Sequence, residues 1–273
     1  MTGGRQVRPA ATSGLAPAYS AVRARVGLVV VLFALAGLAW WWSAGQMQGM
    51  DAGPWTTLGT FGWFVGVWVA MMTAMMFPSV APTVALYARM TRTREPLAPL
   101  AFVSGYLLIW TVAGIAAFGA AIAATRVGGD AIMWDHAGRA LAGATLLVAG
   151  VYELTPLKDV CLGKCRSPLG FLLGSWRDGR LGGLRMGMRH GAWCVGCCWA
   201  LMASLFALGV MSITWMALVA GLIAIEKTVP WPRIATYATA AVLVGLGVVL
   251  LADPAALPGL TVPGGQPMPG MGG

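Results

Sequence analysis

The sequence predicts an all-α protein, a polytopic helical membrane bundle of about seven transmembrane helices, with the N-terminus cytoplasmic and the C-terminus outside. Of its 273 residues, 58% are hydrophobic and only 10% are charged, whereas a soluble domain carries about 25% charged residues. The hydrophobic residues form long uninterrupted runs. Such runs lack the alternation of barrel strands, and in lipid only helices and closed barrels satisfy their backbone polar groups. These observations together favour a multi-pass protein of the cytoplasmic membrane.

The positions of the positive charges predict the orientation of the bundle. The net charge is +9, but only two of the 18 Lys and Arg residues, Arg126 and Arg139, fall in the segments expected outside. This asymmetry follows the positive-inside rule of membrane proteins. The basic character is therefore assigned to topology and to the lipid bilayer, and no nucleic-acid partner is expected.

The N-terminal region predicts a tail followed by a first span. Residues 1–25 hold four arginines among Pro, Ala, Ser and Gly, a composition that predicts a disordered basic tail. Residues 26–44 are apolar over a longer stretch than the roughly 7 to 15 residues of a signal peptide and lack a clear Ala-x-Ala cleavage site. We therefore expect a retained span, which ends in an interfacial belt at Trp40, Trp41 and Trp42.

The remaining spans are expected at residues 58–76, 99–123, 138–154, 190–208, 213–225 and 234–251. The span at 213–225 is short for a hydrocarbon core of roughly 30 Å, so a six-span alternative would join it to 190–208 as a re-entrant pair. We expect one helical transmembrane domain over residues 26–252 and a flexible Pro, Gly and Met tail at 253–273.

The most basic segment, residues 155–189, is expected to be a cytoplasmic loop that contains two cysteines. Within it, Ser167 and Pro168 form an N-cap and first-turn pair. The apolar residues that follow predict a short helix on the inner membrane surface.

The stretch from His190 to Met202 places three thiols at the start of an apolar run. On a helix each residue advances by about 100° and 1.5 Å, so Cys194, Cys197 and Cys198 share one face. His190 and Met202 extend this stripe by a turn at each end, but His190 and Cys198 are about 12 Å apart along the axis. A metal ion held here must therefore take ligands from a second segment.

The predicted topology brings soft ligands from two other segments to the same membrane depth. The basic loop supplies Cys161 and Cys165, and the inner end of the second span supplies methionines. Buried Cys and Met are ordinary packing residues, yet five thiols at one membrane face favour a metal site. The candidate metal ligands are Cys161, Cys165, His190, Cys194, Cys197, Cys198, Met72, Met75, Met76 and Met202.

The chemistry of these ligands favours Cu(I) over zinc as the bound transition metal ion. Cytosolic thiols stay reduced, and thiolates with thioethers select soft ions such as Cu(I). A zinc ion with four thiolates would leave about two net negative charges close to lipid. Cu(I) with two thiolates would leave one, which Lys164, Arg166 or Arg189 could offset.

Two acidic residues and an outer group of soft ligands are weaker candidates. Glu226 could balance the charge of Lys227 or Arg189, or accept protons during metal release. Glu153, near the inner end of its span, is a similar candidate. An acidic residue at the end of a span is more often an interfacial charge. A second site outside would be built from Met47, Met50, Met133, His136, Met211, Met268 and Met271.

Four blocks of the sequence carry a resemblance to a known family. They are Met71-Met-Thr-Ala-Met-Met-Phe-Pro-Ser79, Tyr152-Glu-Leu-Thr-Pro-Leu-Lys-Asp-Val-Cys-Leu-Gly-Lys-Cys-Arg166, His190-Gly-Ala-Trp-Cys-Val-Gly-Cys-Cys-Trp-Ala-Leu-Met202 and Glu226-Lys227. Together they resemble a bacterial family described as predicted metal-binding integral membrane proteins, a domain of unknown function. The resemblance covers roughly residues 60–230 and implies metal binding, without an ion or a reaction. Glu153 departs from the uncharged Gln expected there.

The leading hypothesis is a membrane protein that binds Cu(I) for transport, delivery or resistance, and we do not expect it to be an enzyme. Its partners would be a metal chaperone or a subunit of a membrane complex, and a homo-oligomer fits the same sequence. One alternative is a thiol–disulfide oxidoreductase in which Cys194 and Cys197 exchange with Cys161 and Cys165. Another is a structural or assembly subunit of a membrane complex. The sequence has no P-loop or phosphorylated-Asp motif, so we expect no ATP-driven pumping by this chain alone.

Overall fold

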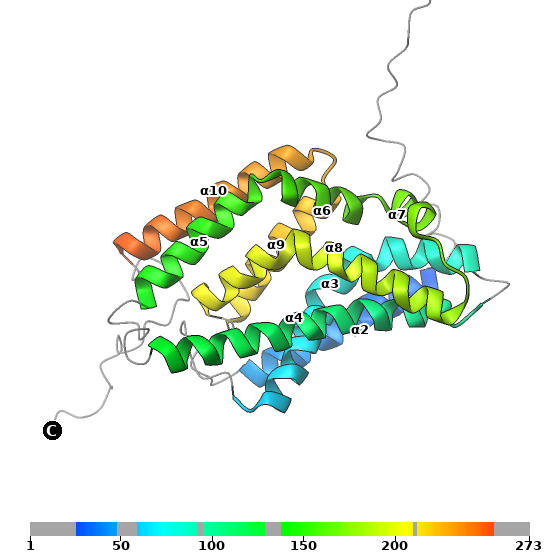
Figure 1. The fold of residues 1–273 in the computed structure, drawn as a ribbon, viewed down its shortest axis with the longest axis horizontal. Helices are drawn as coiled ribbons and strands as arrows, with labels where there is room; N and C mark the ends of the chain where they lie inside the picture. Colours follow the sequence, from blue (N-terminus) through cyan, green and yellow to red (C-terminus); the bar gives the residue numbers. More distant parts are fainter. Residues whose placement is uncertain (1–25, 48–58, 92–94, 129–137, 210–211, 254–273) are drawn as a thin grey trace, which may run out of the picture.

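The computed structural model describes residues 26–47, 59–91, 95–128, 138–209 and 212–253, and all regular structure within these ranges is helical (Figure 1). The prediction of an all-helical fold is confirmed for this part of the chain. The predicted tails lie outside the described residues, as do Met50, Met133, His136, Met211, Met268 and Met271 of the outer candidate site. The described helices are α2 (Val26–Met47), α3 (Phe61–Thr91), α4 (Ala98–Gly128), α5 (Arg139–Glu153), α6 (Pro156–Arg166), α7 (Pro168–Ser175), α8 (Gly179–Leu208), α9 (Ile213–Thr228) and α10 (Pro232–Ala252).

Five of these helices, α2, α3, α4, α8 and α10, are long and apolar enough to cross a membrane. Helices α5 and α6 form a sixth candidate span with a bend of 68° between them. Helix α9 has 16 residues, fewer than the roughly 20 that a straight span needs. This set of apolar helices is compatible with a multi-pass membrane protein, and the count of seven spans and the orientation of the termini remain predictions.

Helix α3 runs 15 residues past Met76, where the second span was expected to end. It continues to Thr91 through Pro78 and Pro82. Proline removes a backbone donor, but membrane helices tolerate it where neighbouring groups satisfy the freed carbonyls. Beside the first proline, the hydroxyl of Ser79 donates to the carbonyl of Met76 at 2.8 Å.

The segment expected to be a cytoplasmic loop, residues 155–189, is mostly helical. Thr155 caps α6, where its side chain accepts from the backbone N–H of Lys158, and Pro156 occupies the first turn. The short helix predicted after Ser167 is confirmed as α7. Helix α8 then begins at Gly179, whose φ of 77° lies in the left-handed region that favours glycine. Cys161 and Cys165 therefore lie on a helix, which fixes their directions.

Helix α8 is the central element of the bundle, packed against α4, α5, α6 and α9 (Figure 1). It approaches α4 through Gly183, Gly187 and Gly191, which recur every four residues. A Cβ atom at Gly187 would lie 1.9 Å from the backbone oxygen of Phe102 on α4. Small residues at this spacing allow membrane helices to pack backbone to backbone. This contact fixes the position of the cysteine-bearing half of α8.

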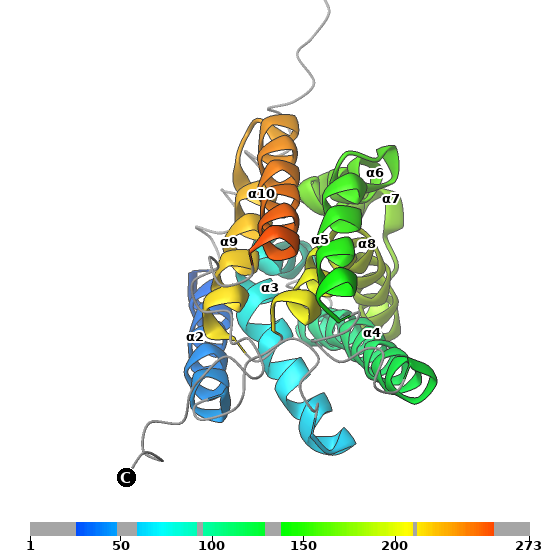
Figure 2. The same ribbon diagram turned by 90° about the vertical axis from the view of Figure 1, so that its left-hand side faces the viewer.

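The other helices form pairs around this centre. Helix α2 packs on α3, and α5 lies beside α10 in both views (Figures 1 and 2). Helix α6 leaves the end of α5 and contacts α7, α8 and α9. The fold thus places α6 and its two cysteines across the middle of α8.

Candidate metal centre

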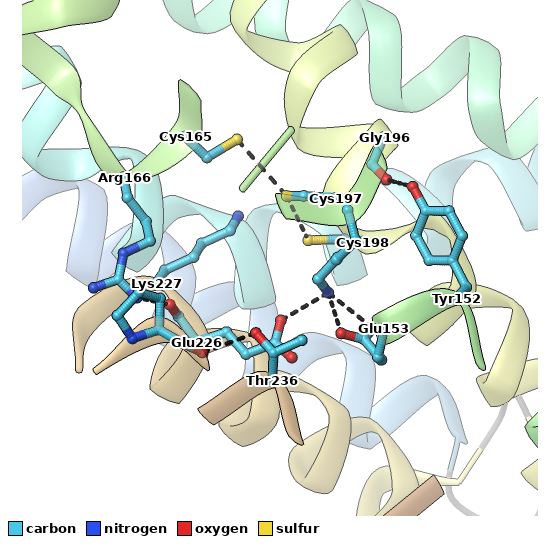
Figure 3. Close-up of polar contacts among 12 residues, drawn as sticks. Tyr152, Glu153, Cys165, Arg166, Gly196, Cys197, Cys198, Glu226, Lys227 and Thr236 are labelled. Carbon is cyan, nitrogen blue, oxygen red and sulfur yellow. Dashed lines mark hydrogen bonds and ion pairs between the residues drawn. The ribbon is translucent and has the colours of Figure 1, made fainter. Parts of the chain in front are cut away.

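Three cysteine sulfurs from two helices form one group in the interior. Cys165 of α6 and Cys194 and Cys197 of α8 have Sγ atoms that all lie within 4.8 Å of one another. The Sγ atoms of Cys197 and Cys165 are 3.7 Å apart (Figure 3). Cys194 and Cys197 are buried, and Cys165 is 9% exposed. We call these three residues the sulfur triplet, and its geometry is compatible with metal binding.

The triplet confirms the predicted proximity of the two cysteine groups for Cys165. Cys194 and Cys197 stand at i and i+3 of α8, and this spacing places both on the side that α6 covers. The third sulfur, of Cys165, comes from a residue 32 positions before Cys197 in the chain. The site therefore requires α6 and α8 to be packed together.

Gly196 provides the contact surface between α6 and α8. A Cβ atom there would lie 2.8 Å from the sulfur of Cys161, so the absent side chain makes room for that thiol. The Tyr152 hydroxyl donates to the Gly196 carbonyl at 2.6 Å (Figure 3). Cys161 thus packs against the α8 backbone one turn before Cys165. This contact sets how closely α6 approaches α8, and with it the distance from Cys165 to Cys194 and Cys197.

Cys194 is the member of the triplet with polar partners outside the cysteines. Its sulfur lies 3.1 Å from the hydroxyl of Tyr106 and 3.1 Å from the Nζ atom of Lys227. Lys227 also contacts the Ser79 hydroxyl at 3.3 Å and the Met76 sulfur at 4.0 Å. The Lys227 side chain extends toward the cysteines (Figure 3). This contact places a positively charged donor beside one sulfur of the triplet.

The other two sequence-predicted thiols, Cys161 and Cys198, are not members of the triplet, although Cys198 lies next to it. Cys198 has its sulfur 3.3 Å from that of Cys197 (Figure 3) but is not within the common 4.8 Å of the three. Cys161 faces Gly196. Periodicity could identify the face that these residues share but not which sulfurs would converge.

His190 is enclosed by aromatic rings rather than by the triplet. Its ring centroid lies 4.7 Å from that of Phe171, 5.8 Å from that of Phe102 and 6.0 Å from that of Tyr106. Its Nδ1 atom is buried and has no hydrogen-bond partner among the described residues. A ligand role for His190 remains a prediction.

The methionine candidates are all buried, and Met76 is the one connected to the site by a contact, through Lys227. Met72 and Met75 belong to the core of the bundle. Met202 of α8 lines an apolar cavity of about 420 Å³ together with Trp68 of α3 and Trp110 of α4. Ligand roles for Met72, Met75, Met76 and Met202 also remain predictions.

A buried ion cluster lies at the junction of α5, α6 and α9. The Nζ atom of Lys158 is 2.6 Å from a Glu153 carboxylate oxygen and 2.8 Å from one of Glu226, and all three side chains are at most 1% exposed. Glu226 thus pairs with Lys158 rather than with Lys227 or Arg189, the partners expected from the sequence. Successive helical residues point about 100° apart, so Glu226 and Lys227 face different neighbours (Figure 3).

Arg166 forms a second link between α6 and α9. Its guanidinium donates to the carbonyls of Glu226 and Val229 at the end of α9. The last carbonyls of a helix have no partner within the helix, and a cation placed there is favourable. Lys158 and Arg166 flank Cys165 in sequence, so both anchor the helix that carries it. Sequence reasoning identified the acids at the span ends but missed Lys158 as their partner.

Comparison with known proteins gives one match. A protein-family model described as PpoB2, copper chaperone, matches residues 65–250. The matched range contains the sulfur triplet, Lys227 and the Lys158 ion cluster. No curated protein and no solved structure shows a significant match. The match supports the expectation of a family linked to a metal.

Proposed function

Since the chain belongs to the PpoB2 copper chaperone family, we propose that it is a multi-pass membrane protein that binds Cu(I) as its cargo through Cys165, Cys194 and Cys197. The observation that carries this proposal is the convergence of three thiols from two helices within 4.8 Å. The predicted topology puts the site on the cytoplasmic side, where thiols stay reduced.

The number and type of the ligands favour Cu(I) over zinc. Structural zinc sites are almost always four-coordinate, and the described residues supply a group of three sulfurs. Thiolate ligands select Cu(I) among the biological metals that accept low coordination. The triplet therefore suits a soft ion with two or three sulfur ligands.

The arrangement also suits a protein that passes its cargo on. Two ligands stand on the long central helix α8, and the third stands on the 11-residue helix α6. A movement of α6 would remove one sulfur and leave the other two in place. The receiving partner would then be a second thiol-bearing copper protein or a membrane-complex subunit.

The test is copper bound by the purified full-length protein after loading with Cu(I) under reducing conditions. We expect about one Cu(I) per wild-type chain and loss of this copper in the C165S/C194S/C197S variant. The matched control is C161S/C198S, which removes the two thiols outside the triplet and should retain copper. Equal copper in the wild type and the triplet variant would overturn the proposal.

One observation favours a second candidate function, thiol–disulfide exchange. The Sγ atoms of Cys165 and Cys197 lie 3.7 Å apart, close enough for a small movement to allow a disulfide bond. An exchanger would form a mixed disulfide with its partner after one of these two cysteines is changed to Ser. Absence of such adducts in both single variants would exclude this function.

A further inference from the structure

Lys227, which is partly buried, has different surroundings from the buried Lys158. Lys158 is neutralised by two carboxylates. Lys227 forms no ion pair with a carboxylate among the described residues, and its neighbours are the Ser79 hydroxyl and the sulfurs of Met76 and Cys194. A partly buried ammonium without a counter-ion is costly. The group within its reach that can carry a negative charge is the Cys194 sulfur.

The charge of a Cu(I)–thiolate complex depends on how many sulfurs bind. Two thiolates around Cu(I) give a net charge of −1, and three give −2. Near lipid the second complex is the more costly of the two, unless a fixed cation stands beside it. Lys227 is such a cation, with its Nζ atom 3.1 Å from one of the three sulfurs.

We propose that Lys227 sets the coordination number of the bound Cu(I), because its charge allows Cys194 to bind as a third ligand beside Cys165 and Cys197. This inference rests on the proposed function and deepens it. Lys227 is a positioning residue here, since it contacts a ligand and not the ion. When Cu(I) binds, each ligating thiol releases its proton to solvent, and the ion keeps its oxidation state throughout.

The geometry predicts which sulfur depends on Lys227. The Cys194 sulfur contacts both the Lys227 ammonium and the Tyr106 hydroxyl, whereas the sulfurs of Cys165 and Cys197 contact each other. Without the ammonium, a third thiolate would add a negative charge that no neighbouring cation offsets, so Cu(I) should keep the sulfurs of Cys165 and Cys197 alone. The complex would then be two-coordinate.

The experiment is X-ray absorption spectroscopy at the copper edge on Cu(I)-loaded full-length protein, which counts the sulfur ligands. We expect three sulfurs in the wild type and in Lys227→Arg, which keeps the charge. We expect two in Lys227→Met and in Lys227→Gln, which lose the charge; the Gln side chain can still donate to a neighbour. The matched control is Lys164→Met, which removes an exposed lysine of α6 and should keep three sulfur ligands.

Affinity measurements with a competing Cu(I) chelator provide the second readout. An ammonium near the site is expected to strengthen Cu(I) binding by about ten- to a hundredfold at an effective dielectric constant of about 20, discounted for partial exposure. Cys194→Ser should lower the affinity by a similar factor. Adding Lys227→Met to Cys194→Ser should then change little, because both substitutions remove the same interaction.

Several outcomes would overturn the inference while leaving the proposed function intact. They are two sulfurs in the wild type, three sulfurs in both neutral variants, or full additivity of Cys194→Ser and Lys227→Met. Two sulfurs in Lys227→Arg would also overturn it, since shape rather than charge would then matter. A wild type that binds no copper would instead refute the proposed function itself. Where Lys227→Met fails to fold, Lys227→Gln, which keeps a hydrogen-bond donor, carries the test.

Discussion

Replacing Lys158 by Met should be among the most destabilising single changes in this protein. The change removes the one cation between Glu153 and Glu226, whose carboxylate oxygens lie 2.6 and 2.8 Å from its Nζ atom. At an effective dielectric constant of about 20, each contact contributes about 6 kcal/mol of attraction. Most of this attraction offsets desolvation in the native state, so the net loss for removing one partner of a buried cluster is about 3 to 5 kcal/mol.

Glu226→Gln is the matched comparison for this prediction. The cluster has two carboxylates for one ammonium, and one oxygen of Glu226 has no hydrogen-bond partner among the described residues. Neutralising Glu226 leaves a balanced pair of Lys158 and Glu153 and an amide oxygen that still accepts from Lys158. We expect a loss of about 1 kcal/mol or less.

The assay is denaturant unfolding of the full-length protein in detergent micelles, followed by the fluorescence of its 13 tryptophans. Lys158→Met should lower the free energy of unfolding by several times more than Glu226→Gln. It should also weaken Cu(I) binding, because Lys158 anchors the helix that carries Cys165. Equal stability of Lys158→Met and the wild type would refute the electrostatic reasoning, as would an equally large loss in Glu226→Gln.

Three further predictions concern packing and ligand choice. Gly187→Ala should destabilise the fold by about 1 to 3 kcal/mol, because its Cβ would lie 1.9 Å from the α4 backbone. Gly221→Ala on α9 is the control and should leave the stability unchanged, because a Cβ there meets nothing within 4 Å. Thermal unfolding compares the two variants. Gly196→Ala should displace Cys161, because the sulfur of Cys161 would lie 2.8 Å from the new Cβ. The displacement should shift α6 and so lower the Cu(I) affinity, which competition with a Cu(I) chelator measures. Cys165→Ser should lower that affinity more than Cys161→Ser, and the reverse order would contradict membership of Cys165 in the triplet.

The sequence was a good guide to where the helices lie. Long apolar runs predict helices because lipid forces each segment to satisfy its own backbone, and every predicted span coincides with a described helix. The helix ends were less predictable. Pro78 and the arginines of residues 177–189 look like loop signals, yet α3 continues through the proline and α8 carries Arg185 and Arg189 on its exposed side.

The site was predictable as a group of candidates but not as a geometry. Spacing places Cys194, Cys197 and Cys198 on one face, but the depth and angle at which α6 crosses α8 decide which sulfurs meet. That crossing depends on Gly196 and on the links from Lys158 and Arg166 to α9, which join residues 60 or more positions apart. The glycine series at 183, 187 and 191 was visible in the sequence and is the signal that could have located the α4 contact.

The links from α6 to the end of α9 also bear on biosynthesis. Cys165 is made before Cys194 and Cys197, but the groups of α9 that hold its helix in place, the Glu226 carboxylate and the carbonyls of Glu226 and Val229, are made after all three cysteines. A ribosome-bound chain that stops before residue 226 would contain all five thiols and lack a fixed third ligand. On the proposed function, we therefore expect such a nascent chain to offer Cu(I) only the two sulfurs of α8, and the three-sulfur site to form after α9 has been made and inserted.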